Sequence, residues 1–291
     1  IAAGKFGRLL VARGRSYRVR KSIGFKQPTN PPPEVDYNLW LGPAPMQPYH
    51  ENLVHYNWHW FWDTGNGDIG NNGVHHTDAT RWLIPNATLP KAIISLGGRF
   101  LWNDQGQTPN LQVALFDFGH AKMIFETTEF KTKGGRDDRV FDTKSKGQAV
   151  QVVSPPDVLN PTAPRGPGST IFENFIACVR SRRPQELDAH ILEGHYSSAL
   201  CHLANISYRL GHEASFASKP KELGSDAEVD KSFQWFKEIL VDLGIKLDKA
   251  TYRLGRALTF DPQTEKFVGD AEADKLLTRE YRKPFVVPDP V

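Results

Sequence analysis

The sequence predicts an α+β fold built on a mainly antiparallel β-sheet with helices packed on one of its faces. Three strand-like segments, 92–96, 111–118 and 122–130, follow one another without a helix between them. Neighbouring strands with short connections pair as antiparallel strands, which separates this pattern from an alternating strand and helix fold. Helical periodicity occurs in other stretches, so we expect the helices to cover the sheet.

Helical patterns are clearest in the second half of the chain. An apolar stripe at helical spacing runs over 192–210, with Asp188 as a candidate N-cap and Gly211 as a candidate C-cap. A shorter amphipathic helix is expected over 172–179. A capping-box match at Ser225 predicts a third helix over 229–243, ended by Gly244. Two polar or proline-rich stretches, 131–146 and 154–168, are expected to be surface loops, and the tail from Asp261 is expected to be irregular.

Both faces of the predicted sheet carry apolar side chains. Leu111, Val113 and Leu115 alternate with Ala114, Phe116 and Phe118. An open sheet seldom leaves an apolar face in water. We therefore expect helices on one face and a partner subunit on the other, which makes the protein a homo-oligomer.

An N-terminal strand is predicted over 9–19, with a basic face that includes Arg13, Arg15 and Tyr17. Lysine and arginine often protect exposed sheet edges, so a solvated strand is one explanation. The other is a platform for a polyhydroxylated or anionic ligand, for which Arg15, Tyr17 and Arg18 are the candidate contacts.

Composition excludes several classes of function. The 291 residues are 39% hydrophobic and 24% charged, with a net charge of +3, which is too small to indicate nucleic-acid binding. No apolar run is long enough for a membrane span. The two cysteines, Cys178 and Cys201, have no metal-site spacing and are expected to be buried free thiols. The chain begins without Met, so its localisation, cytoplasmic or periplasmic, cannot be read from it.

The segment 50–78 has the composition of a small-molecule pocket. It holds five histidines and the aromatic run from Trp58 to Trp62. Aromatic rings supply apolar walls, and imidazoles and carboxylates move protons near neutral pH. His55 and His59 lie four residues apart, but no third ligand accompanies them, so a metal site is not expected. Trp58, His59 and Trp60 are candidate ligand contacts.

Gly65 to Gly70 spell GxGxxG, the pattern of a dinucleotide-binding turn. That pattern requires a buried strand before it and an acidic residue about 20 positions after it. Neither is present, so we interpret these glycines as a tight turn that brings Asn71, Asn72 and His75 toward a ligand. On the helix predicted over 192–210, His195, Ser198, His202 and Asn205 form a polar row that is either solvated or faces the pocket.

The segment GDIGNNGVHHTDATRW, residues 67–82, resembles the D-x-G-x-H-x-x-D pattern of the Gfo/Idh/MocA oxidoreductases. NWHWFWDTGNGDIGN, GGRF at 97–100 and DQGQTPN at 104–110 resemble one bacterial branch of that family. The resemblance implies an N-terminal Rossmann domain for NAD or NADP and a C-terminal domain whose large open sheet lines the substrate site. Residues 1–291 resemble only the second part, as a single domain.

The resemblance also assigns roles to residues. The catalytic histidine corresponds to His75 and the last acid of the motif to Asp78, whereas the first acid is replaced by Asn71. Asp68 is the nearest carboxylate that can substitute for it. In the family the histidine accepts the proton of a substrate hydroxyl. We therefore predict His75 and Asp78 as catalytic, and Asp68, Asn71, Asn72 and His195 among the substrate contacts.

Three functions remain open at this stage. The first is the substrate half of a nicotinamide-dependent oxidoreductase acting on a sugar, cyclitol or related polyol. The second is a lyase or glycosidase that retains NAD and oxidises its substrate transiently. The third is a non-catalytic carbohydrate-binding or scaffold protein. In the first two cases this chain alone is expected to bind no dinucleotide and to turn over no substrate.

Overall fold

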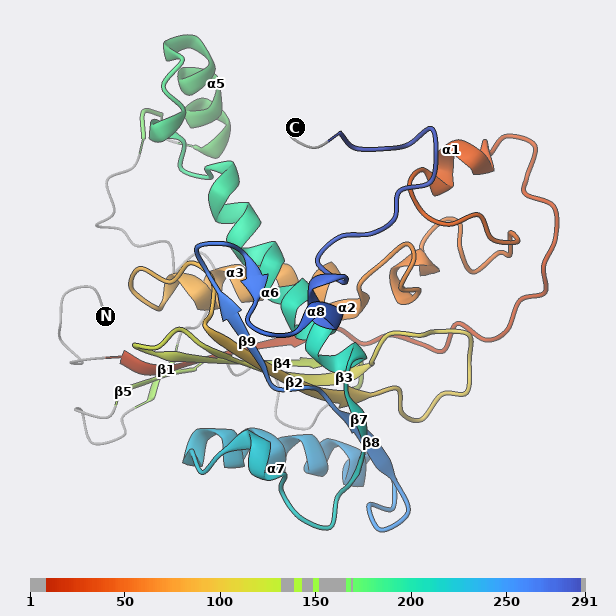
Figure 1. Ribbon diagram of the computed structural model, residues 1–291, viewed down its shortest axis with the longest axis vertical. Coiled ribbons are helices and arrows are strands. Elements are labelled where there is room, and N and C mark those ends of the chain that lie inside the picture. The colour runs from red at the N-terminus through yellow and green to blue at the C-terminus, as the bar shows by residue number, and fades with distance from the viewer. Residues whose placement is uncertain (1–8, 132–138, 143–148, 152–165, 169, 289–291) are drawn as a thin grey trace.

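The computed structural model describes residues 9–131, 139–142, 149–151, 166–168 and 170–288 (Figure 1). Its sheet has the strand order β10-β9-β2-β3-β4-β1-β5-β6, and β8 pairs with both β2 and β7. All pairings among the described strands are antiparallel except that between β1 and β4. The predicted α+β fold with a mainly antiparallel sheet is therefore confirmed. The strands are β1 Leu9–Tyr17, β2 Ala92–Gly98, β3 Leu111–Asp117, β4 Lys122–Thr128, β5 Arg139–Asp142, β6 Ala149–Gln151, β7 His212–Ser215, β8 Thr251–Leu254, β9 Leu258–Asp261 and β10 Lys266–Phe267.

The predicted helices are present, with different caps. His190 accepts the N–H of Leu192 at the start of the longest helix, and Asp188 instead accepts the N–H of Gly166. Asp226, not Ser225, caps the last long helix by accepting the N–H of Glu228. The helices are α1 Tyr37–Leu41, η1 Asn57–Trp60, α2 Gly67–Asn71, α3 Gly73–Trp82, α5 Ile171–Ser181, η2 Pro184–Glu186, α6 Ile191–Arg209, η3 Lys221–Leu223, α7 Ala227–Asp242 and α8 Ala271–Asp274.

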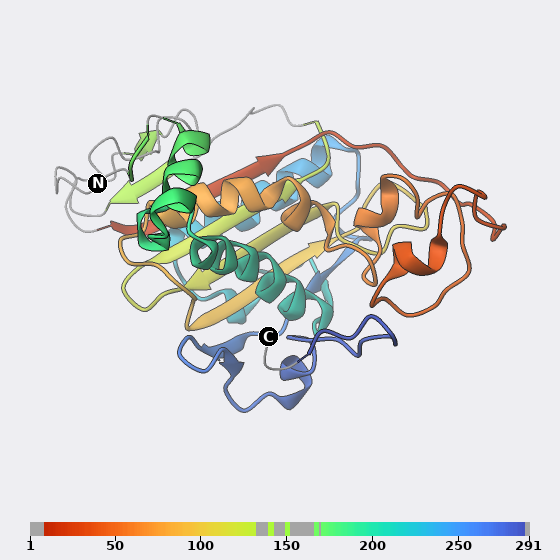
Figure 2. The same cartoon turned by 90° about the horizontal axis from the view of Figure 1, so that it is seen from above.

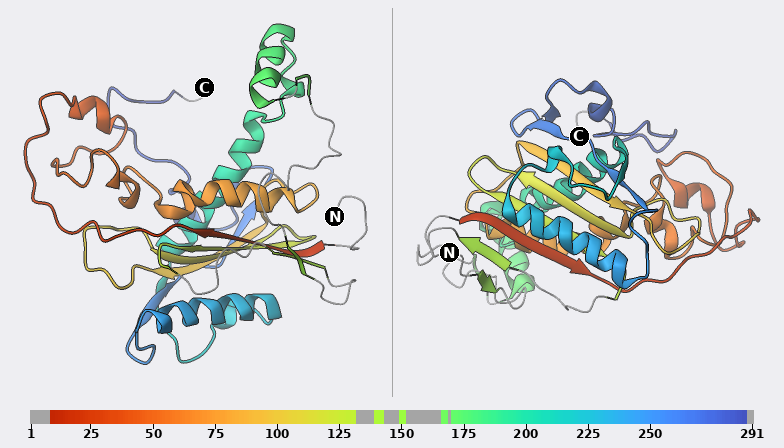
Figure 3. Two further views of the ribbon diagram at one scale, coloured as in Figure 1. Left: turned by 180° about the vertical axis from the view of Figure 1, so that it is seen from behind. Right: turned by 90° about the horizontal axis from the view of Figure 1, so that it is seen from below.

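Helices cover both faces of the sheet, which corrects the prediction of one covered face. Figures 1 and 2 show α3 and α6 lying over one face, and Figure 3 shows α7 across the other. Phe116, Met123 and Phe125 pack with α6 residues in one core, whereas Val113 and Ile124 pack with Phe236 of α7 in a second core. The apolar face assigned to a partner subunit is thus covered by the chain itself.

Strand β1 lies inside the sheet, between β4 and β5. Arg13 and Arg15 point toward α7 and are buried or half-buried. Arg15 Nε donates to Glu126 at 2.7 Å, and its guanidinium lies 4.6 Å from the centre of the Trp235 ring. Arg13 donates to the backbone oxygen of Glu228 at 2.6 Å. The basic face is therefore neither a solvated edge nor an open ligand platform, because it forms ion pairs under a helix.

Three smaller predictions are also corrected or left open. The expected loop over 131–146 contains β5, and the expected loop over 154–168 lies mostly outside the described residues. The tail is irregular only after α8, because β9 ends at Asp261 and is followed by β10 and α8, whereas residues 275–288 form no helix or strand. Cys178 and Cys201 are buried free thiols, as predicted.

Within the described residues, every helix is too short or too polar to cross a membrane.

Candidate functional site

His75 lies on an exposed surface at the end of β1. Helix α2 continues into α3 through Asn72, whose backbone is itself helical, so positions 68, 71 and 75 recur about one turn apart. Asn71 Nδ2 donates to the Tyr56 hydroxyl at 3.4 Å, and Asn72 Nδ2 donates to the Ser16 hydroxyl at 2.9 Å. His75 itself is exposed. We define the His75 surface as Arg20, Tyr56, Asp68, Asn71, Asn72 and His75.

The ion pair between Arg20 and Asp68 forms the buried base of the His75 surface. Arg20 donates to Asp68 Oδ1 from Nη2 at 2.8 Å and from Nε at 3.2 Å, and its Nη1 donates to the Tyr56 hydroxyl at 2.8 Å. The guanidinium also lies 5.2 Å from the centre of the Trp60 ring. Burial raises the pKa of the Asp68 carboxyl, although Arg20 and Arg18 lower it. Asp68 therefore keeps Arg20 and Tyr56 in place and is sealed from solvent.

A second buried carboxyl lies near this pair. Glu129 is 1% exposed, and neither of its carboxyl oxygens has a hydrogen-bond partner among the described residues. Its pKa is raised to about 8, mainly by burial and also by the charge of Asp68, while Arg99 and Arg20 oppose the shift. Glu129 is thus protonated at neutral pH. Sequence reasoning did not single out Arg20 or Glu129, because nothing local distinguishes them from solvated charges.

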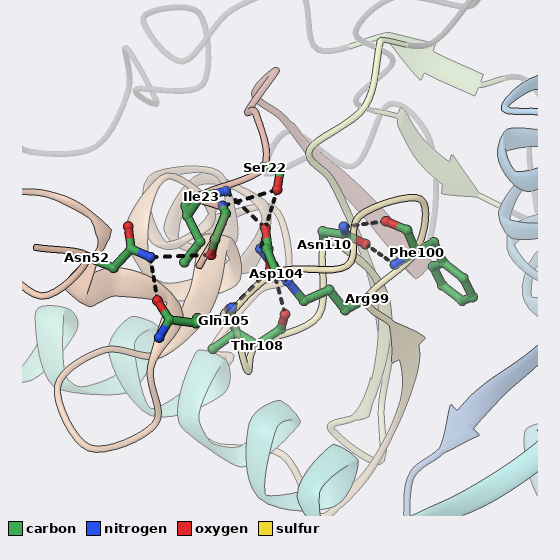
Figure 4. A network of polar contacts seen from close by, with 11 residues as sticks. Ser22, Ile23, Asn52, Arg99, Phe100, Asp104, Gln105, Thr108 and Asn110 are labelled. Atoms are coloured by element: carbon green, nitrogen blue, oxygen red, sulfur yellow. Dashed lines mark hydrogen bonds and ion pairs between the residues drawn. The ribbon is translucent and has the colours of Figure 1, made fainter. Parts of the chain in front are cut away.

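The loop between β2 and β3 fixes the chain that leads from β1 into the pocket segment. Arg99 forms two hydrogen bonds with Asp104, at 2.7 and 2.9 Å. Asp104 in turn accepts the hydroxyl of Ser22 and the N–H of Ile23, each at 3.0 Å (Figure 4). Gln105 accepts from Asn52 at 2.7 Å in the same network. These hydrogen bonds therefore join three parts of the chain in one polar network, namely residues 20–26, residue 52 and residues 99–110.

Asp78, the second predicted catalytic residue, faces α6. It accepts the Ser197 hydroxyl, and Ser197 also accepts a hydrogen bond from Arg81 at 3.0 Å. Arg81 then binds Glu193 at 2.5 Å. No described interaction joins Asp78 to His75. Its contacts therefore join α3 to α6 and do not orient the imidazole.

A cavity of about 1080 Å³ opens on the opposite flank of α6 from α3. We call it the α6 cavity. Three segments form its walls: α6, the turn after η1, and the tail 275–281. It contains the predicted contacts Trp58 and His195, but not His75 or Asp78. Its lining includes two tryptophans, two histidines and charged side chains of both signs, among them Trp58, Trp62, Asp63, His195, His202, Asn205, Arg209, Glu265, Lys275, Arg279 and Glu280.

Two histidines lie in the wall of the α6 cavity. His195 Nε2 lies 3.0 Å from both carboxylate oxygens of Glu265. The polar row predicted on this helix, His195, Ser198, His202 and Asn205, lines the α6 cavity. Desolvation lowers the pKa of His202, which favours the neutral imidazole. Trp58 is stacked on His59 with ring centres 3.6 Å apart, and desolvation lowers the pKa of His59 as well.

The glycine turn is explained by packing. A Cβ at Gly70 would lie 2.1 Å from Asn66, and a Cβ at Gly65 would lie 2.4 Å from the backbone of His59. Gly67 has φ of +73° and contacts Thr108. The element before the turn is the short helix η1, not a strand. The glycines at 65, 67 and 70 are therefore accounted for by close packing within a turn that follows a helix.

Part of this chain matches the model of a known protein family. Residues 20–95 match the model of the Gfo/Idh/MocA oxidoreductase family, C-terminal alpha/beta domain. The resemblance predicted from the sequence is confirmed over this segment, which carries the whole His75 surface and the α2–α3 motif. No curated protein sequence matches the chain.

Two solved structures are similar to this chain. The WlbA dehydrogenase from Bordetella pertussis, in complex with NADH and UDP-GlcNAcA, is 16% identical over 68% of this chain and 51% of its own, with a TM-score of 0.43. GenD2 from gentamicin A biosynthesis, in complex with NAD, is 14% identical over 68% of this chain and 53% of its own, with a TM-score of 0.40. The chain thus spans about half the length of each of these proteins.

Besides Asp78, which contacts α6, and His59, which is stacked on Trp58, the predicted site residues fall into three groups. Asp68, Asn71, Asn72 and His75 lie together, with Trp60 beneath them and Arg18 near enough to lower the pKa of Asp68. Trp58 and His195 line the α6 cavity instead. Arg15, and by strand alternation Tyr17, face α7 on the other side of the sheet, which removes them from the His75 surface. Among the described residues, no group of three His, Cys, Asp or Glu side chains is arranged for a metal ion.

Proposed function

We propose that this chain is the substrate-binding half of a nicotinamide-dependent oxidoreductase acting on a sugar, cyclitol or related polyol. The observation that carries the proposal is the exposed position of His75 inside the segment that matches the oxidoreductase domain. An imidazole at a solvent-facing position can accept a hydroxyl proton at neutral pH. The neighbouring amides of Asn71 and Asn72 offer donors and acceptors that suit a polyol.

The proposed roles follow from the contacts. His75 accepts the proton of the substrate hydroxyl that is oxidised. Arg20, Tyr56 and Asn71 form a hydrogen-bonded group beside it. Asp78 stabilises the packing of α3 on α6 through Ser197. Asn71 cannot serve as a base, so proton transfer through that position is not part of the proposal.

NAD or NADP is the cofactor that this activity requires, and the described residues contain no cradle for it. The only GxGxxG is occupied by packing contacts with Asn66, His59 and Thr108. We therefore assign cofactor binding to a dinucleotide-binding domain other than the one described, and we expect the 291-residue chain alone to be inactive. Calorimetric titration of this chain with NAD and with NADP tests that expectation, and micromolar affinity for either would contradict it.

The decisive assay is NADH or NADPH formation by the protein carrying that second domain, measured over a panel of polyols. His75→Asn should lower kcat/KM by about 10²- to 10⁴-fold. His212→Asn is the matched control, because His212 is exposed on β7 and lies outside both the His75 surface and the α6 cavity. Equal activity of His75→Asn and the wild type would refute the catalytic role.

Two alternatives share part of this support. A lyase or glycosidase with a transient oxidation step would consume substrate without net NADH formation, so the same assay separates it from a dehydrogenase. A non-catalytic carbohydrate-binding protein is favoured by Asn71, which replaces the first acid of the motif. It would bind polyols and convert none of them.

A further inference from the structure

Helix α5 turns its apolar side toward solvent. Figures 1 and 3 show α5 at the outer end of the molecule, beyond the part of α6 that covers the sheet. The other side of the helix is the one held to the chain. Asn174 Nδ2 donates to the backbone oxygens of Pro167 and Glu186, at 3.2 and 2.9 Å, and Asn174 Oδ1 accepts the N–H of Asp188. Cys178, one turn further on, is buried on that same side.

Five large apolar side chains form one stripe on the exposed side of α5. They recur three or four residues apart, so they share one face of the helix, and each is between 44% and 73% exposed. We define the α5 stripe as Ile171, Phe172, Phe175, Ile176 and Val179. With about 200 Å² for the whole surface of a large apolar side chain, the exposed part of the stripe is about 600 Å². That area lies at the upper limit of the apolar patches that monomeric proteins leave in water.

A second copy of the chain is a partner that this area suits. Two copies that pack their stripes together remove about 1,200 Å² from water, which is the lower end of the range for specific interfaces between proteins. The rim of the contact adds further area. The sheet does not offer such a contact, because α7 covers the face that α3 and α6 leave free.

The order of side chains along α5 suits a second copy that runs in the opposite direction. Around a two-fold axis that passes between residues 175 and 176, Phe175 lies opposite Ile176 of the second copy. Phe172 then lies opposite Val179 of the second copy. Each contact sets an aromatic ring against a smaller aliphatic side chain, and such alternation of large and small side chains allows two helices to pack closely.

Charged side chains border the α5 stripe along one edge. Glu173 and Arg180 lie two turns apart on this edge, and both are exposed. Glu173 also accepts the N–H of Thr170 at 3.1 Å, which helps to orient its carboxylate. In the antiparallel pair the same edges meet in reversed order, so Glu173 of each copy lies near Arg180 of the other. The two copies are therefore complementary in charge as well as in shape.

We propose that the α5 stripe is a homodimer interface, in which α5 packs antiparallel against α5 of a second copy. The proposal does not depend on the proposed function, because neither the His75 surface nor the α6 cavity includes a residue of α5. The modest area predicts a reversible dimer with a dissociation constant of about 1–100 µM.

Sedimentation equilibrium of the 291-residue chain tests the proposal. We expect an equilibrium between the monomer and a particle of twice its mass over about 1–200 µM, with no larger species. Phe175→Glu places a charge beside the two-fold axis and should weaken association at least about 100-fold. Phe25→Glu is the matched control, because Phe25 is 60% exposed and lies outside α5, and it should leave the dissociation constant unchanged.

Exchange of charges tests the antiparallel direction. Arg180→Glu and Glu173→Lys each set like charges against one another in both symmetry-related pairs, so each variant alone should associate about 3- to 10-fold more weakly. An equimolar mixture of the two variants restores both attractions and should form a heterodimer of nearly wild-type affinity. The side chains of the α5 stripe lie outside both cores, so Phe175→Glu should leave the urea midpoint of the monomer unchanged at sub-micromolar concentration.

Four results would overturn the proposal. The first three are a monomer at every concentration, a dimer that folded Phe175→Glu does not weaken, and a mixture of the charge variants that associates no better than either alone. The fourth concerns the protein that carries the dinucleotide-binding domain, whose dimer Phe175→Glu should also weaken. An unchanged oligomeric state of that protein, with its two domains now unfolding separately, would mean that the second domain covers the α5 stripe.

Discussion

Replacing Glu129 with glutamine should remove a large pH dependence of stability. The Glu129 carboxyl has a pKa of about 8 in the folded protein, against an ordinary value of 4.5 for a glutamate in water. Between these values the folded state holds a proton that the unfolded state has released. Protonation therefore stabilises the fold fully below pH 4.5, and this contribution is lost as pH rises toward 8. A difference of 3.5 pKa units corresponds to about 5 kcal/mol.

The measurement is urea unfolding of wild type and Glu129→Gln at several pH values from 5 to 9. Glutamine has nearly the shape of the protonated acid and carries no charge. We expect the two proteins to have similar free energies of unfolding at pH 5, and the variant to be more stable above pH 8. Water that reaches the carboxyl reduces the difference in unfolding free energy below the full value of about 5 kcal/mol. We expect the variant to be more stable than the wild type by at least about 2 kcal/mol above pH 8. Parallel curves for the two proteins across this range would refute the reasoning.

Three further comparisons between variants test other parts of the structure by the free energy of unfolding in urea. Arg20→Met should cost about 3–5 kcal/mol at pH 7, because Asp68 is left buried without its cation, and adding Asp68→Asn should restore part of the loss. An undiminished stability of Arg20→Met would mean that the pair is not buried as described. Gly67→Ala should cost about 1–3 kcal/mol, since φ is +73° and Thr108 lies 2.9 Å from the new Cβ. Gly194→Ala in the open interior of α6 should instead stabilise by up to about 1 kcal/mol, and equal effects at the two glycines would count against the turn geometry. Phe236→Ala should cost about 3–5 kcal/mol and the 73%-exposed Phe172→Ala less than about 0.5, and a reversed order would show that α7 does not cover the sheet.

The sequence predicted those features that depend on local pattern. Residues 111–118 and 122–130 are apolar strand-like segments on either side of a short turn, and they form the hairpin of β3 and β4. The stripe over 192–210 gives the long helix α6, although its cap is His190, because Asp188 is engaged by Gly166. The glycine turn was separated from a nucleotide cradle by the absence of a preceding strand, which the structure confirms.

Features that depend on distant contacts were not predictable in this way. Arg15 reads as part of a basic face, and only the packing of α7 reveals that it is covered. Arg20 meets Asp68 across 48 residues of chain, and no local pattern separates it from the surrounding basic residues. The α6 cavity is closed by residues 275–281, whose position depends on the whole fold. Its walls therefore could not be predicted from the segment 50–78.

The place of β1 inside the sheet has a consequence for how the chain folds. Strands β2, β3 and β4 are joined by short connections and can pair soon after they are synthesised. Strand β1 is made first, yet its partner β4 lies more than 100 residues later, with Val11 opposite Lys122. Closing so long a loop is slow and entropically costly. We therefore expect β1 to pair with β4 later than β3 and β4 pair with each other.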